Sequence, residues 1–367
     1  MMPIDSMIWF DPSVLRWIAC CLFFNGLIAY LWHKKFYRQL GLKAYKAIQR
    51  IHLNETPRLG GLIYILSLAG FVTHCQPGEG ANILRLILIS LTPALFIALK
   101  EDLFHNVEPA MRLLSLIFVG WIFRATFTGP LPDLSGVPLL GELVLLQGGI
   151  SLFYILSMVA IANGMNLIDG VNGLCGAVAL SILSALLFLS YKSNDTVMLP
   201  LVFSAILMLI PFMLFNFPFG KIFLGDLGAY SLGLIVSMLT IILFGRHPEI
   251  SPYAAVLVLI YPLTEIVFTI LRRVLRGVSV FRPDTLHLHL KIFYFLRPQP
   301  AYKKIANALV MPTLSSLWIF PLLSLSWTYQ KPFFAVAAIV IFVGLYLSLY
   351  AMLPNIQKKK KQFISVS

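Results

Sequence analysis

Charged residues are scarce in this chain, and acidic residues are the scarcest of them. The 367 residues include 15 Asp and Glu against 28 Lys and Arg, and only 12% are charged whereas 59% are hydrophobic. A water-soluble fold of this length could not cover so much apolar surface with polar groups. The composition therefore excludes an ordinary soluble protein and indicates that the lipid bilayer is part of its solvent.

Cysteine patterns, linkers and internal repeats are also lacking. Cys20, Cys21, Cys75 and Cys175 show neither metal-binding nor disulfide spacing, so we expect buried thiols. No Ser-, Gly- or Pro-rich linker divides the chain into separate domains, which predicts a single integral-membrane domain over residues 1–367. The absence of a convincing internal repeat argues against an inverted-repeat transporter.

What the chain does contain is a series of apolar runs long enough to cross a bilayer as helices. These runs predict an all-α polytopic membrane protein with about eleven spans, at residues 12–32, 59–75, 83–100, 111–128, 150–168, 174–191, 197–215, 228–245, 251–271, 305–325 and 333–353. Between the fourth and fifth spans, residues 129–149 are rich in Pro and Gly. We expect this segment to form an irregular or short hairpin cap.

The basic residues predict how the bundle is oriented. With the N-terminus outside and the C-terminus inside, 22 of the 28 Lys and Arg lie in or beside cytoplasmic segments, and the other six are Arg16, Arg85, Arg124, Lys192, Arg246 and Lys331. The positive-inside rule favours that orientation. The cytoplasmic loops are then expected at about 33–58, 101–110, 169–173, 216–227 and 272–304. The net charge of +13 follows from this topology and from attraction to anionic lipid, so no nucleic-acid partner is required.

Four polar clusters lie at the predicted cytoplasmic ends of helices, and the first is the acidic pair Glu101 and Asp102. Adjacent carboxylates at a membrane surface repel one another unless a cation or a proton lies between them. A solvated helix end is the plain alternative. The pair alone does not decide between these interpretations.

The second cluster fills residues 163–174. Asn163, Asn166 and Asp169 recur every three residues, so a helical turn would place them on one face. Gly170 and Gly173 then allow a tight turn into the next span. Amides and a carboxylate wedged between apolar helices are expensive unless they bind something, which favours a functional site.

The third and fourth clusters are short motifs flanked by glycine or by basic residues. Asp226 stands between Gly225 and Gly228 near a predicted helix N-terminus, where helix capping is a genuine alternative to ligand binding. His287 and His289 place two imidazoles on one side of an extended segment. A zinc half-site would need further ligands nearby, and among several arginines phosphate binding is the more natural use.

Together these clusters supply oxygen ligands for a hard cation and basic groups for phosphates. Mg²⁺ bound by a few protein oxygens and by substrate phosphates fits such a set of residues. The sequence therefore leads to the hypothesis of phosphoryl transfer at a membrane surface.

The pattern resembles the polyprenyl-phosphate N-acetylhexosamine-1-phosphate transferases, which include enterobacterial-antigen and teichoic-acid initiating enzymes and the MurNAc-pentapeptide translocase. The resemblance rests on five motifs in the family's order: Thr56-Pro57-Arg58-Leu59-Gly60-Gly61, the acidic pair at 101–102, residues 163–174, Gly225-Asp226, and the Pro-Asp-x-x-His-x-His loop. It implies that a UDP-N-acetylhexosamine and polyprenyl (undecaprenyl) phosphate give polyprenyl-diphosphate-sugar and UMP, with Mg²⁺, or Mn²⁺ in its place. It further implies the bacterial cytoplasmic (inner) membrane and, by family analogy alone, a homodimer.

The resemblance also implies metal-binding and catalytic roles. Asp226 and Asn166 would hold the metal against the diphosphate, with Asp169 nearby as a catalytic group. Glu101 and Asp102 would lie where the lipid phosphate enters, one of them as its base. We favour direct attack by the acceptor, because a phosphate is already a competent nucleophile and needs mainly positioning and charge neutralisation.

The same resemblance implies a set of substrate-binding residues. Phe223 occupies the position that stacks on uracil, and the histidines would contact the donor diphosphate. The full set is Asn163, Asn172, Phe223, Arg282, His287 and His289.

Several positions depart from the family pattern and keep other interpretations open. Glu101 replaces the usual Asp, Asn172 the second acid of Asp-Gly-x-Asp-Gly, Thr285 a frequent arginine and Leu290 the last histidine. An inactive relative acting as a membrane scaffold is therefore an alternative. A transporter would need polar residues at mid-span, where Glu265 is the main exception. The His-x-His loop speaks against the MurNAc-pentapeptide translocase.

Overall fold

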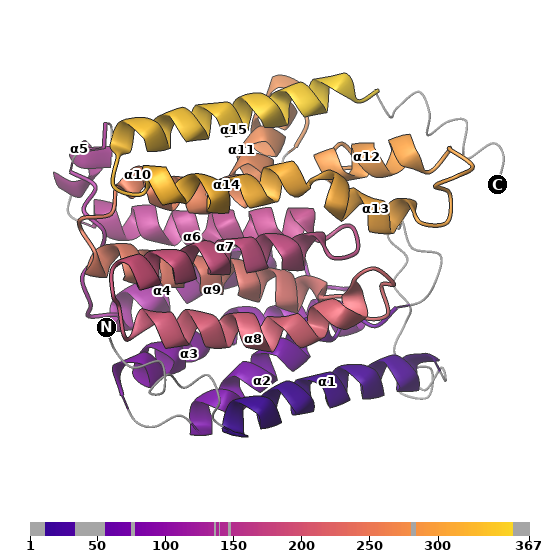
Figure 1. Cartoon of the computed structure of the whole chain (residues 1–367), viewed down its shortest axis with the longest axis horizontal. Helices are drawn as coiled ribbons and strands as arrows, with labels where there is room; N and C mark the ends of the chain where they lie inside the picture. The colour runs from indigo at the N-terminus through magenta and orange to yellow at the C-terminus, as the bar shows by residue number, and fades with distance from the viewer. Residues whose placement is uncertain are drawn as a thin grey trace.

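The computed structural model describes residues 12–33, 56–74, 78–135, 137–138, 140–145, 148–279 and 284–354. Within these ranges the chain forms helices and no strand: α1 (Pro12–His33), α2 (Gly60–His74), α3 (Glu79–Phe104), α4 (Pro109–Thr126), α5 (Leu140–Leu145), α6 (Gly149–Ile168), α7 (Leu174–Lys192), α8 (Met198–Asn216), α9 (Gly225–Arg246), α10 (Pro252–Val258), α11 (Ile260–Leu275), α12 (Leu288–Leu296), α13 (Ala306–Thr313), α14 (Ser315–Thr328) and α15 (Pro332–Met352). The long helices lie side by side, with α5 and α10 at one end of the bundle and α12 and α13 at the other (Figure 1).

The described helices agree with a multi-pass membrane protein. Eight segments, counting α13 and α14 as one, are long and apolar enough to cross a membrane, and α10 with α11 makes a bent ninth. The remaining predicted spans, 12–32 and 59–75, correspond to α1 and α2, whose apolar stretches Leu15–Leu31 and Gly60–Val72 are shorter. The all-α fold is therefore observed, whereas the count of eleven spans and the N-out orientation remain predictions.

The predicted span at 251–271 is not one straight helix. Its two halves, α10 and α11, meet at Leu259 with a bend of 77°. Pro262 explains the position of the break, because proline has no N–H to give to the carbonyl four residues earlier, that of Val258, and its ring clashes with that carbonyl. The bend brings the start of α11 against Gly164 of α6, where a Cβ would lie 2.3 Å from the Pro262 carbonyl oxygen.

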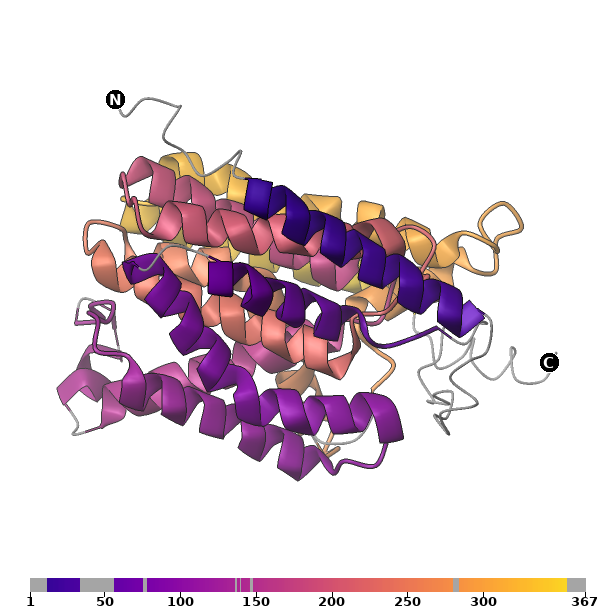
Figure 2. The same cartoon turned by 90° about the horizontal axis from the view of Figure 1, so that it is seen from below.

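Helix α9 forms the centre of the bundle and is enclosed on all sides. Every residue of α9 from Gly225 to Phe244 is buried, and α2, α3, α6 and α7 pack around it. Figure 2 shows α1 and α2 crossing one face of the bundle, with α3 and α4 along its edge. Small residues make the closest crossings: a Cβ on Gly61 of α2 would lie 2.2 Å from the Cα of Gly228, and one on Gly233 would lie 2.5 Å from the Cα of Ala162. Such residues let membrane helices approach backbone to backbone.

The segment predicted as a cap contains irregular chain and the short helix α5, and its described residues hold no strand hairpin. The hydroxyl of Tyr154 donates to the carbonyl of Pro132 at 2.9 Å. The carbonyl of Pro130 packs on Gly245, where a Cβ would lie 2.0 Å from its oxygen. The expectation of irregular structure is therefore met, and this segment closes the C-terminal end of α9.

Three of the four cysteines lie among the described residues, and all three are free thiols. Cys21 and Cys175 are buried and Cys20 is half-buried, broadly as expected. Cys75 lies outside the described residues.

Candidate functional site

The predicted polar motifs converge on the first turn of α9. The amides of Gly60 and Gly61 donate to the carbonyls of Phe223 and Leu224, each at 2.9 Å, so the start of α2 lies beside the start of α9. Gly225 between them adopts φ +79°, a left-handed conformation that glycine adopts without strain. A Cβ at Gly225 would also lie 2.6 Å from a carboxylate oxygen of α3, so the turn has room only for glycine.

That carboxylate belongs to Asp102, which caps α9. Its two oxygens accept hydrogen bonds from the amides of Asp226 and Leu227, both at 2.9 Å, and the Nε of Arg58 lies 3.2 Å away. Unpaired amides and the helix dipole both favour a carboxylate at this position. The capping interpretation considered for Asp226 thus applies to Asp102, which holds the first turn of α9 in place.

Asp226 itself is held between two arginines. Its Oδ1 lies 2.6 Å from Arg58 and its Oδ2 lies 2.9 Å from Arg112. The side-chain amide of Asn166 on α6 donates to Oδ1 at 3.3 Å. The segment just before α2 and the helices α4, α6 and α9 therefore contribute to one charge cluster, in which Asn166 contacts Asp226. The metal-binding role of these two residues stays a prediction.

The two arginines were missing from the predicted site. Arg58 stood in a motif without a role, and Arg112 was counted only as a topology marker at the start of a span. The signal for Arg112 was its place at the edge of an apolar run, because an ionisable residue inside a membrane segment marks a functional site by default.

The acidic pair on α3 splits between two directions. The Oε2 of Glu101 accepts a hydrogen bond from the amide of Val107 at 2.9 Å, and its Oε1 lies 4.0 Å from Arg112. Asp102 faces α9 instead. Neither carboxylate faces the other for a shared cation, and their predicted role at the lipid phosphate remains a prediction.

Asp169 lies at the C-cap of α6, and its carboxylate lacks a hydrogen-bond partner among the described residues. Burial raises its pKa well above the usual range; Arg58 opposes this shift, and Asp226 and Asp102 add to it. A carboxylate in that setting is stabilised by any cation that approaches it. Asn163, predicted to share its face, instead donates to the carbonyl of Val159 in its own helix at 2.8 Å.

Asn172 ties loops together. Its side-chain amide donates to the carbonyl of Pro218 at 2.8 Å, and its backbone amide donates to Asn307 of α13 at 2.7 Å. The next amide, of Gly173, donates to Asn216 of α8 at 2.6 Å. The geometry favours a structural role for Asn172, and its predicted contact with substrate remains untested.

The Pro-Asp-x-x-His-x-His loop folds back on α11 through its acid. Asp284 pairs with Arg272 and lies 3.6 Å from the Nε of Arg273, and it accepts a hydrogen bond from the Leu286 amide at 2.9 Å. Burial would raise the pKa of Asp284, but the neighbouring Arg272 outweighs it and the pKa falls below its usual range. Arg272 is thus engaged within the protein. Arg282, predicted to help bind phosphate, lies outside the described residues.

The two histidine rings lie in parallel, but the predicted extended segment is wrong, because His287 lies at the N-cap of α12 and His289 lies in its first turn. Their ring centroids are 5.7 Å apart with an interplanar angle of 6°, and both side chains are buried. A Cβ on Gly170 would lie 2.4 Å from the Nε2 of His289. The histidine loop therefore rests on the turn that carries Asp169, so it joins the same end of the bundle as the charge cluster.

The donor set of this site fits a cation shared with phosphates. Asp169 is a half-buried carboxylate, unpaired among the described residues, near Asp226 and the amide of Asn166, and oxygen ligands of this kind suit Mg²⁺. Over the part of the chain that the structure describes, no group of three or more His, Cys, Asp or Glu could hold a metal alone. The site thus matches Mg²⁺ bound by one or two carboxylates and completed by substrate, and it does not match a zinc centre.

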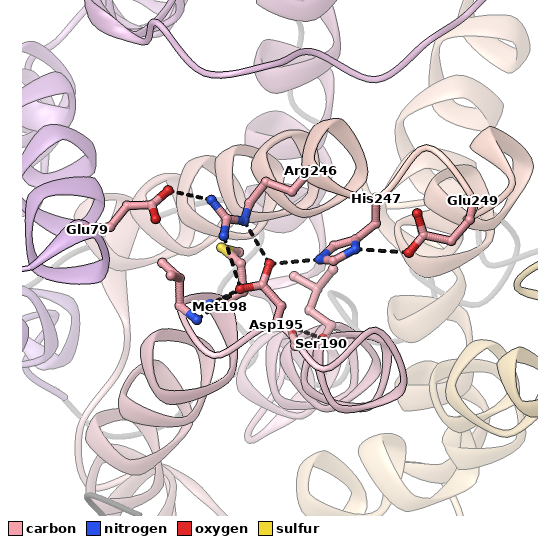
Figure 3. A network of polar contacts seen from close by, with 9 residues as sticks. Glu79, Ser190, Asp195, Met198, Arg246, His247 and Glu249 are labelled. Atoms are coloured by element: carbon pink, nitrogen blue, oxygen red, sulfur yellow. Dashed lines mark hydrogen bonds and ion pairs between the residues drawn. The ribbon is translucent and has the colours of Figure 1, made fainter. Parts of the chain in front are cut away.

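A second network lies at the opposite end of α9, in the turn between α7 and α8 (Figure 3). The carboxylate of Asp195 lies 2.7 Å from the Nε of Arg246 and 2.8 Å from the Nε2 of His247. It also accepts hydrogen bonds from two backbone amides at 2.9 Å, while Arg246 pairs with Glu79 and the Nδ1 of His247 lies 3.0 Å from Glu249. Because these partners satisfy one another, we interpret this Asp195 network as a structural clamp.

Comparison with known proteins gives a consistent picture. The profile of glycosyl transferase family 4 matches residues 84–244, from α3 to α9. The chain is 27% identical over 252 residues to a probable undecaprenyl-phosphate N-acetylglucosaminyl 1-phosphate transferase of Bacillus subtilis (strain 168), covering 67% of this chain and 68% of that protein. It is 27% identical over 286 residues to the decaprenyl-phosphate N-acetylglucosaminephosphotransferase of Mycobacterium tuberculosis, covering 68% and 69%. A phospho-N-acetylmuramoyl-pentapeptide-transferase of Carboxydothermus hydrogenoformans is 28% identical over 264 residues, covering 66% and 78%.

Proposed function

We propose that the chain is a member of glycosyl transferase family 4, whose profile matches residues 84–244, and that it transfers N-acetylhexosamine 1-phosphate from a UDP-sugar to polyprenyl phosphate and releases UMP. The observation that carries this proposal is the charge cluster at the start of α9. There a carboxylate is held between Arg58 and Arg112, beside the unpaired carboxylate of Asp169. Cations and acids so placed suit a reaction between two phosphate-bearing substrates.

In the proposed reaction an oxygen of the lipid phosphate attacks the phosphorus that carries the sugar. The bond from that phosphorus to the bridging oxygen breaks, and UMP leaves with that oxygen. Arg58 and Arg112 supply positive charge to the substrate phosphates, and Asp102 keeps the first turn of α9 in register with them. Mg²⁺, when bound, would be held by Asp226, Asn166 and the nearby Asp169 and would neutralise diphosphate charge.

The remaining substrate contacts follow from the same proposal. Phe223 would stack on uracil, and its backbone is fixed by a hydrogen bond from its amide to the Pro57 carbonyl at 2.8 Å. His287 and His289 would contact the donor diphosphate. Glu101 would lie near the entry of the lipid phosphate, where Arg112 orients it.

The donor sugar and the compartment are further parts of the proposal. Relatives named for N-acetylglucosamine phosphate and for phospho-N-acetylmuramoyl-pentapeptide match at 27% and 28% identity, so identity does not separate the two donors. We favour the N-acetylglucosamine 1-phosphate branch because of the His-x-His loop. Relatives from bacteria and the multi-pass architecture support the bacterial cytoplasmic membrane.

The test is UMP release by the purified full-length protein with undecaprenyl phosphate, Mg²⁺ and a panel of UDP-sugars that includes UDP-MurNAc-pentapeptide. We expect release with one donor, loss on adding EDTA, and at least a ~100-fold loss in Asp226→Asn, because this carboxylate belongs to the reacting centre. Asp133→Asn, which changes an exposed acid in the cap, is the matched control and should keep full activity. No release from any donor by folded protein would contradict the proposal and favour a scaffold.

A further inference from the structure

A fully buried carboxylate lies in α11, outside the charge cluster of the site. Glu265 is 0% exposed and lies one helical turn from Tyr261 and one turn from Thr269. Tyr346 of α15 interacts with the same carboxylate. Among the described residues, both Glu265 oxygens and both tyrosine hydroxyls are enclosed without a hydrogen-bond partner. An acid buried in a membrane helix is costly unless a cation compensates it.

His287 is the side chain that comes nearest to compensating this charge. Its Nδ1 lies 3.5 Å from the Oε2 of Glu265 and 3.5 Å from the Oγ1 of Thr269. Both distances are long for hydrogen bonds but close enough for an ion pair. The titratable and charged groups around His287 are Glu265 and Arg272 on α11, Asp284 on its own segment, His289 on α12 and Tyr346 on α15.

The other charged groups near His287 do not pair with Glu265. Arg272 pairs with Asp284 and donates to the Leu286 carbonyl at 2.8 Å. Burial, followed by the charge of His287, lowers the pKa of His289 to about 3, so His289 is neutral at physiological pH. His287 is therefore the imidazole that faces Glu265.

The opposite edges of the two imidazoles are left for a ligand. Neither Nε2 atom has a hydrogen-bond partner among the described residues, and neither is among the enclosed unpartnered atoms, whereas the Nδ1 of His289 is. The Nε2 of His289 abuts Gly170, next to Asp169. The stacked rings thus connect α11 with the turn that enters the charge cluster.

We propose that Glu265 is a positioning residue that holds His287 by its Nδ1 edge and keeps it an imidazolium whose Nε2–H donates to an anionic phosphate oxygen of the donor. This inference rests on the proposed function for the identity of the ligand and extends it to a residue distant from the charge cluster. A carboxylate partner fixes both the tautomer and the charge of an imidazole, so that the ring presents one defined donor.

The activity test compares Glu265→Gln and Glu265→Asp with the wild type in the UMP-release assay. Glu265→Gln should lower kcat/KM for the donor about tenfold, with the alkaline limb of the pH profile moved down by about one pH unit, because the imidazolium has lost its opposite charge. Glu265→Asp should restore part of both. In a His287→Ala background the Glu265→Gln change should have no further effect. Glu249→Gln removes the Glu–His contact in the Asp195 network and should change neither quantity.

An unmoved pH profile, or additive effects of the Glu265 and His287 changes, would overturn the inference. A second readout does not depend on catalysis: NMR of selectively 15N-histidine-labelled protein in nanodiscs. The His287 nitrogens should titrate at lower pH in Glu265→Gln than in the wild type. If the wild type releases no UMP but this shift is seen, the proposed function fails while the Glu265–His287 pair stands; if the titration is unchanged, the pair fails.

Discussion

At Arg58 one guanidinium joins carboxylates from two helices. Its Nε lies 3.2 Å from Asp102 and its terminal nitrogen 2.6 Å from Asp226, so it ties α3 to α9. Arg112 makes one such contact at 2.9 Å and stands 4.0 Å from Glu101. The planar fork of arginine matches two acceptors at once, whereas the ammonium group of lysine is a single point charge.

This asymmetry predicts unequal effects of two conservative changes. Arg58→Lys should lower kcat/KM for the donor about tenfold, since losing a hydrogen bond to a charged group costs about 1–3 kcal/mol. In Arg112→Lys the single ammonium group can still reach Asp226, so kcat/KM for the donor should fall by less than about threefold. Steady-state UMP release measures both, and equal losses would contradict the bridging role of Arg58.

The acids of the site could be predicted from sequence and their partners could not. Asp226 and Asp169 stood out because a carboxylate between apolar helices has few structural uses. Arg58 and Arg112 were hidden among the basic residues that set topology, which are expected at the same ends of helices. The three-residue spacing grouped Asn163 with Asn166. Only Asn166 donates to Asp226, whereas Asn163 donates to a carbonyl of its own helix, and the spacing carries no information on where α9 lies.

At the scale of elements, the crossing of α2 and α9 places Arg58, two residues before the start of α2, against the acid in the first turn of α9. The crossing has no room for a side chain, since a Cβ on Gly61 would lie 2.2 Å from the Cα of Gly228. Three residues earlier in the chain stands Arg58. Separating the helices would therefore also lengthen the contact from Arg58 to Asp226.

Gly61→Ala should thus damage both stability and activity. The added methyl meets backbone and not a movable side chain, and overpacking of this kind costs about 1–3 kcal/mol. We expect a lower Tm together with reduced UMP release. Gly344→Ala on α15 is the matched control, because a Cβ there has nothing within 4 Å. Unchanged stability in Gly61→Ala would show that this crossing is looser than described.

Element positions were largely predictable, and element shape was less so. The expected spans 150–168 and 174–191 match Gly149–Ile168 and Leu174–Lys192, because apolar length and flanking glycines mark where a membrane helix begins and ends. The 77° bend between α10 and α11 was missed, although Pro262 gave its signal. Hydropathy measures how apolar a segment is and contains no information on whether its helix is straight or bent.

At the scale of the whole molecule, the Asp195 network joins the far ends of α3, α7, α8 and α9. Burial alone would raise the pKa of Asp195, but Arg246, the amides of Met198 and Val197, and His247 outweigh it and lower the pKa to about 2. A carboxyl whose pKa is lower in the folded state stabilises the fold above its unfolded pKa of about 4. That contribution is lost as the pH falls from about 4 towards 2.

Asp195→Asn should accordingly lower the Tm near neutral pH by about 5 °C, with little effect on kcat at temperatures where the variant is folded. The difference from the wild type should shrink as the pH falls below about 4, since the wild-type carboxyl is then neutralised as well. Thermal unfolding across pH measures this, with Asp133→Asn as an exposed control. A Tm difference that stayed constant down to pH 2 would exclude the charge of Asp195 as its cause.

Helix α9 is pinned by ion pairs at both ends and is enclosed by protein along its length. Its 22 residues span about 33 Å, close to the thickness of a hydrocarbon core. Lipid therefore meets other helices, such as α15, in which only 22% of the span is buried. In a bilayer that is too thin or too thick, these outer helices can tilt to absorb the hydrophobic mismatch, while the central rod keeps its length and the depth of its two charged ends.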